Sequence, residues 1–206
     1  MLEALRVAVE SHTGSFHCHQ IHNEAERRVV AFRHLGVPAV GEFSASDVPG
    51  LREFYSTFGY LTLYFDEISG DAAYSIVSPA EWLDLGQDFA DTFAHLSEDD
   101  LKDWLPAWCA DCIVVGQVPA SGNYLLVPAS GPDAGQVFRF DHDGFEFASV
   151  GSDLPNFVER ALKPDPQALL TMATHLRFSS LRPDEPQWWI DEMRDNRGAV
   201  VRTASE

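Results

Sequence analysis

The sequence predicts an α+β protein with a single twisted, mostly antiparallel sheet, helices packed on one face of that sheet, and helical additions at the chain ends. The chain of 206 residues is 45% hydrophobic and holds 14 Phe and 5 Trp, enough for one buried core in one domain. Runs rich in β-branched and aromatic residues follow one another across short turn signals, which favours antiparallel pairing. Between them lie runs whose apolar residues have helical spacing.

Residues 1–46 are predicted to extend the same domain with helical and strand segments. Asn23, with Glu26 three residues later, resembles a capping box and predicts the start of a helix. Apolar residues follow, and Gly36 is of the residue type that commonly ends a helix.

Residues 47–163 are predicted to form the core of the fold. A short helix opens it, with apolar residues at i, i+3, i+4 and i+7. Ser78 and Glu81 form a capping box before a longer helix, and Ser152 or Asp153 caps the last one. The predicted strands are 61–65, 74–77, 113–115, 124–127, 137–140 and 145–150.

Residues 164–206 are predicted to be a helical appendix to this core. Pro164 and Pro166 end the preceding helix. The spacing of apolar residues predicts helices over 169–178 and 184–193, and the last ten residues are expected to fray.

Several segments of the core follow one another in a distinctive order. A helix ends at Gly59, a strand-to-helix step ends at Trp82, and central hairpins are followed by a closing helix. These segments are 49–59, 74–82, 112–117, 123–127, 135–138 and 154–162. In this order they resemble the SUKH superfamily, the Smi–Knr type of α+β domain. The resemblance covers a little over half of the chain and implies a cytoplasmic binding domain without catalytic residues. Bacterial members are typically immunity proteins that neutralise a partner toxin, often a nuclease.

The charge of the chain excludes several classes of partner. Its 14 Lys and Arg against 32 Asp and Glu give a net charge of −18, and residues 66–166 alone hold 4 basic and 19 acidic residues, a net of −15. Such a surface repels nucleic-acid phosphates and anionic membranes and favours a basic protein partner. The sequence shows neither an apolar run of membrane-spanning length nor a signal-peptide pattern, and its three cysteines are too few for a disulfide framework. We therefore expect a cytoplasmic protein.

Four acidic residues mark a candidate partner-binding surface on the longer helix. Glu81, Asp84, Asp88 and Asp91 recur at spacings of three or four residues, opposite the apolar side. Like charges at this spacing disfavour a helix by roughly 0.2–0.5 kcal/mol per pair, so their presence favours a cationic partner. The alternative interpretation is a solvated helix face without a partner.

Four further residues complete the predicted partner-binding set. Asp66 and Glu67 begin the connection between two predicted strands, and Tyr64 and Trp188 lie outside the periodic core pattern. Exposed Tyr and Trp are typical anchors of protein interfaces. The alternative is that these aromatic residues dock the C-terminal appendix onto the sheet.

Histidines and cysteines give a metal-binding alternative. They are His12, His17, Cys18, His19, His22, Cys109 and Cys112. Their spacing matches no standard zinc finger, and the C-x-x-C pair lacks a thioredoxin-like βαβ context. We therefore expect no metal and no other cofactor.

The function expected from these observations is that of a non-enzymatic immunity protein that binds a cognate toxin with a basic surface. Hydrolase motifs, Gly-rich phosphate loops and zinc-protease motifs do not occur, so no catalytic residue is predicted. Two alternatives stay open. One is a small metal-dependent enzyme or metal-binding protein built on the His and Cys residues, and the other is a regulatory scaffold of the same fold without a toxin partner.

Overall fold

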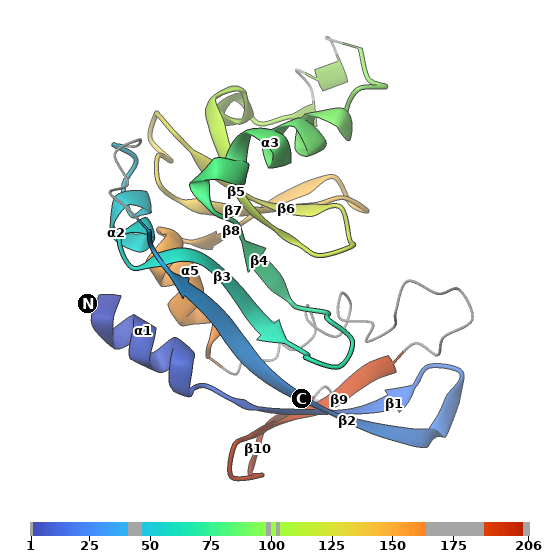
Figure 1. Cartoon of the computed structure of the whole chain (residues 1–206). Coiled ribbons are helices and arrows are strands. Elements are labelled where there is room, and N and C mark those ends of the chain that lie inside the picture. The colour runs from blue at the N-terminus through green and yellow to red at the C-terminus, as the bar shows by residue number, and fades with distance from the viewer. Residues whose placement is uncertain (1, 41–46, 98–99, 102–103, 164–187, 204–206) are drawn as a thin grey trace.

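One continuous β-sheet organises the chain. The computed structural model describes residues 2–40, 47–97, 100–101, 104–163 and 188–203. Within them, ten strands form a sheet in the order β10-β9-β1-β2-β3-β4-β5-β6-β7-β8, and neighbouring strands pair antiparallel (Figure 1). The predicted α+β class with one twisted antiparallel sheet is confirmed.

The elements of the described residues are named here in chain order. The strands are β1 (Gly14–Gln20), β2 (Asn23–Pro38), β3 (Phe58–Phe65), β4 (Tyr74–Ile76), β5 (Cys112–Val118), β6 (Asn123–Pro128), β7 (Val137–Asp141), β8 (Glu146–Gly151), β9 (Trp188–Asp195) and β10 (Val200–Thr203). The α-helices are α1 (Leu2–Ser11), α2 (Leu51–Tyr55), α3 (Trp82–Asp91) and α5 (Leu154–Ala161). Two short 3₁₀ helices are η1 (Pro79–Glu81) and η2 (Ala107–Asp111).

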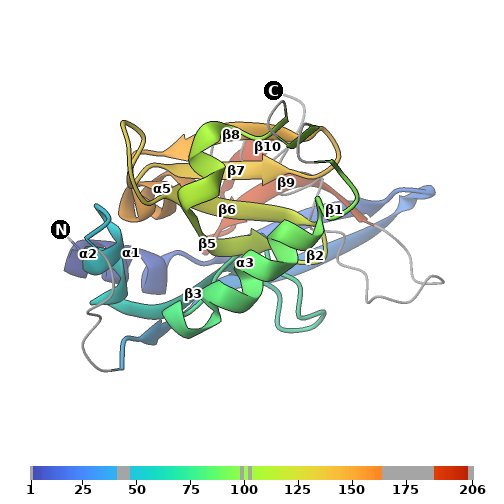
Figure 2. The same cartoon turned by 90° about the horizontal axis from the view of Figure 1, so that it is seen from above.

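Helices cover both faces of the sheet, which corrects the prediction that they pack on one face. Buried residues of α1, α2 and α5 belong to one apolar cluster, and those of α3 belong to another. On β6, Leu125 lies in the first cluster and Leu126 in the second. Because successive strand residues point to opposite faces, α3 packs on the face opposite α5. Figure 2 shows α3 beside β5, the strand that it contacts most.

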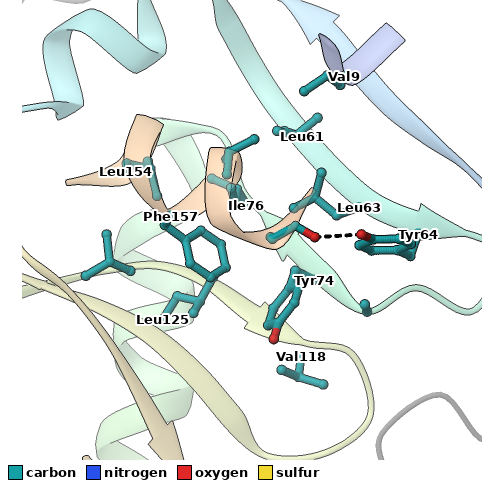
Figure 3. Close-up of a cluster of buried hydrophobic side chains, with 14 of the residues drawn as sticks. Val9, Leu61, Leu63, Tyr64, Tyr74, Ile76, Val118, Leu125, Leu154 and Phe157 are labelled. Carbon is teal, nitrogen blue, oxygen red and sulfur yellow. Dashed lines mark hydrogen bonds between the residues drawn. The ribbon is translucent and has the colours of Figure 1, made fainter. Parts of the chain in front are cut away.

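Tyr64 connects β3 to α5 within the larger cluster (Figure 3). Its side chain is buried, and its hydroxyl donates a hydrogen bond to the carbonyl oxygen of Ala161 at 2.6 Å. Nearby, the rings of Tyr74 and Phe157 meet edge to face with centroids 5.2 Å apart. These contacts hold α5 against β3 and β4.

Two predicted helix starts are confirmed. Glu81 Oε2 accepts hydrogen bonds from the backbone N–H of Ser78 at 3.1 Å and from Ser78 Oγ at 2.6 Å, within a capping box at the start of η1. At α5, the Asp153 carboxylate accepts a hydrogen bond from the backbone N–H of Asn156 at 2.8 Å. The first of these caps fixes where the chain turns from β4 into α3.

Residues 23–36 form a strand, so the helix predicted from Asn23 and Glu26 is wrong. Side chains of β2 alternate between the two faces of the sheet, with Val30, Phe32 and His34 buried and the residues between them exposed. This period of two belongs to a half-buried strand. Pairing with both β1 and β3 outweighs the local resemblance to a capping box.

The described part of the C-terminal segment also forms strands, so the prediction of a helix over 184–193 and of a frayed end is wrong there. β9 pairs with β1, and β10 pairs with β9. Ile190 and Met193 are buried three residues apart, a spacing that resembles one face of a helix. A β-bulge explains the spacing, since the register with β1 shifts between His17 and Cys18. The helix predicted over 169–178 lies outside the described residues.

Candidate functional site

The apolar side of α3 fixes the orientation of the whole helix. Leu85 and Phe89 are buried against the sheet, where Phe89 meets Tyr124 and Phe140 edge to face at 5.5 and 5.4 Å. The helix continues through Gly86, although glycine is a residue type that weakens helices. Its remaining surface is therefore turned away from the sheet in a defined direction.

Three carboxylates lie together on another side of α3. A turn of 100° per residue places them within about 60° of one another around the helix axis. We name this surface the acidic flank, formed by Asp84, Asp88 and Asp91. All three residues are exposed, and ion pairs between described residues involve none of them. Their charge is therefore open to a cationic partner.

Contacts around the acidic flank are with neutral groups. Asp91 Oδ1 accepts a hydrogen bond from Gln87 Nε2 at 2.7 Å. On β6, burial and then the nearby Asp88 carboxylate raise the pKa of the Tyr124 hydroxyl. Asp88 thus lies toward Tyr124, at the boundary between α3 and the sheet.

Glu81 precedes the acidic flank and directly follows Pro79 and Ala80, which line a hollow of about 410 Å³. Its carboxylate accepts the two hydrogen bonds from Ser78, which itself lines the hollow. We name this the proline hollow. It is lined by Val37, Pro38, Ala39, Val40, Tyr55, Gly59, Tyr60, Ser78, Pro79 and Ala80. Glu81 therefore combines a helix-capping role with an exposed charge at the rim of an apolar hollow.

Two predicted partner-binding residues are buried, which corrects their assignment to a surface. Tyr64 is 1% exposed and adopts a left-handed backbone conformation with φ 56°. Asp66 is also 1% exposed, and its carboxylate accepts hydrogen bonds from the backbone N–H groups of Ile68 and Ser69 at 3.0 and 3.2 Å. Arg28 lies 3.5 Å from the Asp66 carboxylate. Asp66 therefore holds the β3–β4 turn in shape.

Glu67 and Trp188 lie on a different part of the sheet from α3. Glu67 forms an ion pair with Arg33 of β2. Trp188 is half-buried, with the Arg28 guanidinium 5.9 Å from its ring centroid. Four strands separate β9 from β5, the strand under α3. The structure thus brings Glu81 and the acidic flank together but does not join Glu67 or Trp188 to them.

Cysteines line a second hollow, of about 540 Å³, on the other side of α3. Cys109 and Cys112 border it together with Gly86 and Ala90. Burial raises the pKa of Cys109 to about 12 and that of Cys112 to about 11. Both groups are therefore protonated thiols at neutral pH rather than reactive thiolates.

The N-terminal histidines distribute over both faces of the sheet. His19 Nδ1 lies 2.6 Å from Asp191 Oδ1, and His17 Nδ1 lies 3.7 Å from Glu192 Oε1, which links β1 to β9. Cys18 lies between them in sequence but points into the core. In the described part of the chain, no group of three or more His, Cys, Asp or Glu residues could hold a metal ion.

A pair of histidines, of which His34 is buried and His12 half-buried, is not predicted by the sequence patterns above. His12 Nδ1 and His34 Nε2 are 2.8 Å apart, and His34 Nδ1 accepts a hydrogen bond from the backbone N–H of Tyr64 at 2.9 Å. Burial, and then His12, lower the pKa of His34 to about 3, and burial lowers the pKa of His12. The pair is thus neutral and connects the end of α1 to β2 and β3. The alternation of Phe32 and His34 in β2 is the only sequence signal for it, and it becomes visible once residues 23–38 are assigned to a strand.

Comparison of the chain with protein-family models, curated protein sequences and solved structures finds no match. Among the helices of the described residues, none combines the length and apolar character needed to cross a membrane.

Proposed function

We propose that this chain is a SUKH-type immunity protein, a non-enzymatic cytoplasmic protein that binds and neutralises a bacterial toxin domain. The observation that carries the proposal is the acidic flank of α3, three exposed carboxylates without an ion-pair partner among the described residues. The resemblance of the core segments to the SUKH superfamily supplies the class of partner.

Electrostatics connects the acidic flank to a toxin that acts on nucleic acid. A nuclease holds phosphates in a basic groove, and a protein surface with carboxylates in a row can occupy that groove. Opposite charges raise association rates by about 10–10³-fold, and salt screens the effect over about 8–10 Å. The flank lies on a helix whose other side is fixed to the sheet, so its charges keep their relative positions.

The test measures binding kinetics to the toxin encoded beside the gene of this protein. We expect D84N/D88N/D91N to slow association and to flatten its dependence on salt, while dissociation changes less. The matched control E24Q/E26Q/D143N removes three exposed carboxylates from other elements and should keep the wild-type rate. Circular dichroism should show both variants to be folded.

Three results would contradict the proposal. An unchanged rate in the folded triple variant would mean that the partner binds elsewhere. An equal effect of both triple variants would reflect net charge rather than the flank. A neighbouring toxin that neither binds the protein nor is neutralised by it would favour the regulatory scaffold.

A further inference from the structure

We propose that the proline hollow receives an apolar side chain of the partner protein, next to a lysine or arginine of the same partner segment that meets Glu81. The inference rests on the proposed function in so far as the acidic flank and the hollow form one binding surface. It adds the chemistry of the partner segment and a second contact site at the beginning of α3.

The hollow presents apolar side chains to solvent. Tyr60 and Val37 are 38% and 37% exposed, and Val40 is 97% exposed. Val37 and Tyr60 are paired neighbours on β2 and β3, so they form a continuous edge of the hollow. The volume of about 410 Å³ is within the range of sites that hold a small ligand or a large side chain.

The wall of the hollow is fixed by hydrogen bonds before any partner arrives. The Tyr55 hydroxyl donates to the carbonyl oxygen of Val77 at 2.8 Å and accepts from Trp82 Nε1 at 3.3 Å. On the other side, Gly59 lets β3 approach the chain at Pro38, since a Cβ there would lie 3.0 Å from the Pro38 carbonyl oxygen. A preformed hollow lowers the entropic cost of binding.

Charge identifies the flanking residue of the partner. Neither lysine nor arginine occurs among the described residues that line the hollow. The Glu81 carboxylate lies at the rim of the hollow, because it accepts a hydrogen bond from Ser78, which lines the hollow. Asp84 follows about one helical turn later, at the start of the acidic flank. An apolar side chain in the hollow therefore brings the adjacent residues of its own chain next to carboxylates. A basic residue is favoured there and an acidic one is repelled.

The test uses a random 12-residue peptide library displayed on phage and selected on the purified protein. We expect enriched peptides to share one large apolar residue beside Lys or Arg. Ala80→Trp places a large side chain at the hollow and should weaken these peptides about tenfold or more. The matched control is Ala90→Trp, an exposed alanine of α3 at the cysteine-lined hollow, which should leave their binding unchanged.

Glu81→Gln tests the charge separately from the shape. Glutamine can keep the capping box, so the fold should be retained and thermal melting should confirm it. The selected peptides should bind about two- to fivefold more weakly to this variant at low salt, with less dependence on salt. Equal binding to wild type and Glu81→Gln would overturn the charge assignment.

The outcomes separate this inference from the proposed function. Failure to enrich peptides, enrichment without basic residues, or equal binding to Ala80→Trp would overturn the role of the hollow. Neutralisation of the toxin could still depend on D84N/D88N/D91N in that case. If the peptides behave as expected but the neighbouring toxin is not neutralised, the hollow remains a binding site and the immunity function fails.

Discussion

At the scale of single residues, the pair of His12 and His34 makes the structure sensitive to acid. The hydrogen bond from Tyr64 N–H to His34 Nδ1 puts the His34 proton on Nε2, which donates to His12 Nδ1. A proton added to His34 would remove its acceptor for Tyr64, inside a cluster of aromatic rings. The rings of Phe32 and Tyr64 lie 6.1 and 4.8 Å from that of His34. The folded state therefore favours the neutral form of His34 over the protonated form.

The stability of the protein should decrease as the pH falls below 6.5. The folded state lowers the pKa of His34 from 6.5 to about 3. The contribution of neutral His34 to folding stability is therefore complete above pH 6.5, the pKa in the unfolded chain, and is lost as the pH falls from 6.5 to 3. One histidine accounts for up to about 1.4 kcal/mol per pH unit. Urea unfolding at pH 7.5, 6.5 and 5.5 measures the slope. His34→Asn, whose amide oxygen can accept from Tyr64, should be less stable at pH 7.5 and show a smaller slope; equal slopes would contradict the assignment.

At the scale of elements, two glycines should respond oppositely to the same substitution. Gly116 of β5 faces β4 so closely that a Cβ would lie 2.4 Å from the Ser75 carbonyl oxygen. At Gly86 of α3 a Cβ would meet no atom within 4 Å, and the backbone φ is not positive. We expect Gly116→Ala to destabilise by about 1–3 kcal/mol and Gly86→Ala to stabilise by about 0.5–1 kcal/mol. Thermal unfolding of both variants tests these two predictions. A Gly116→Ala variant as stable as wild type would mean that β4 and β5 separate easily.

Elements with one consistent local signal can be predicted from the sequence. The capping box at Ser78 and the apolar spacing of α3 agree, so both the helix and the exposure of its acidic flank follow from the sequence. The strands β2 and β9 cannot be predicted in this way, because pairing with strands distant in the sequence determines their conformation. In β9 a bulge imitates helical spacing. The same reasoning applies to the site, since the proline hollow combines segments around positions 38, 55, 60 and 79 that only the sheet brings together.

At the scale of the whole molecule, the last described strands, β9 and β10, extend the sheet beside the first strand, β1, and β9 adds buried side chains to the core. β9 covers the free side of β1, and β1 in turn holds β2 through seven residue pairs from Gly14 to Gln20. Ile190 and Met193 belong to the same buried cluster as residues of α1, β3 and α5. The described C-terminal strands are thus part of the sheet rather than an appendix to it (Figure 1).

Loss of buried side chains in β9 should therefore destabilise the protein as a unit. Ile190 and Met193 are 0% and 1% exposed, so we expect Ile190→Ala and Met193→Ala each to cost about 2–5 kcal/mol. The matched control is Val200→Ala in β10, which is 48% exposed and should change stability by about 0.5 kcal/mol or less. Urea unfolding followed by circular dichroism and by tryptophan fluorescence should give coincident transitions in all three variants, because one sheet carries the whole core. Two separate transitions, or a loss below about 0.5 kcal/mol for Ile190→Ala, would show that β9 packs on the domain without contributing to its cooperative unit.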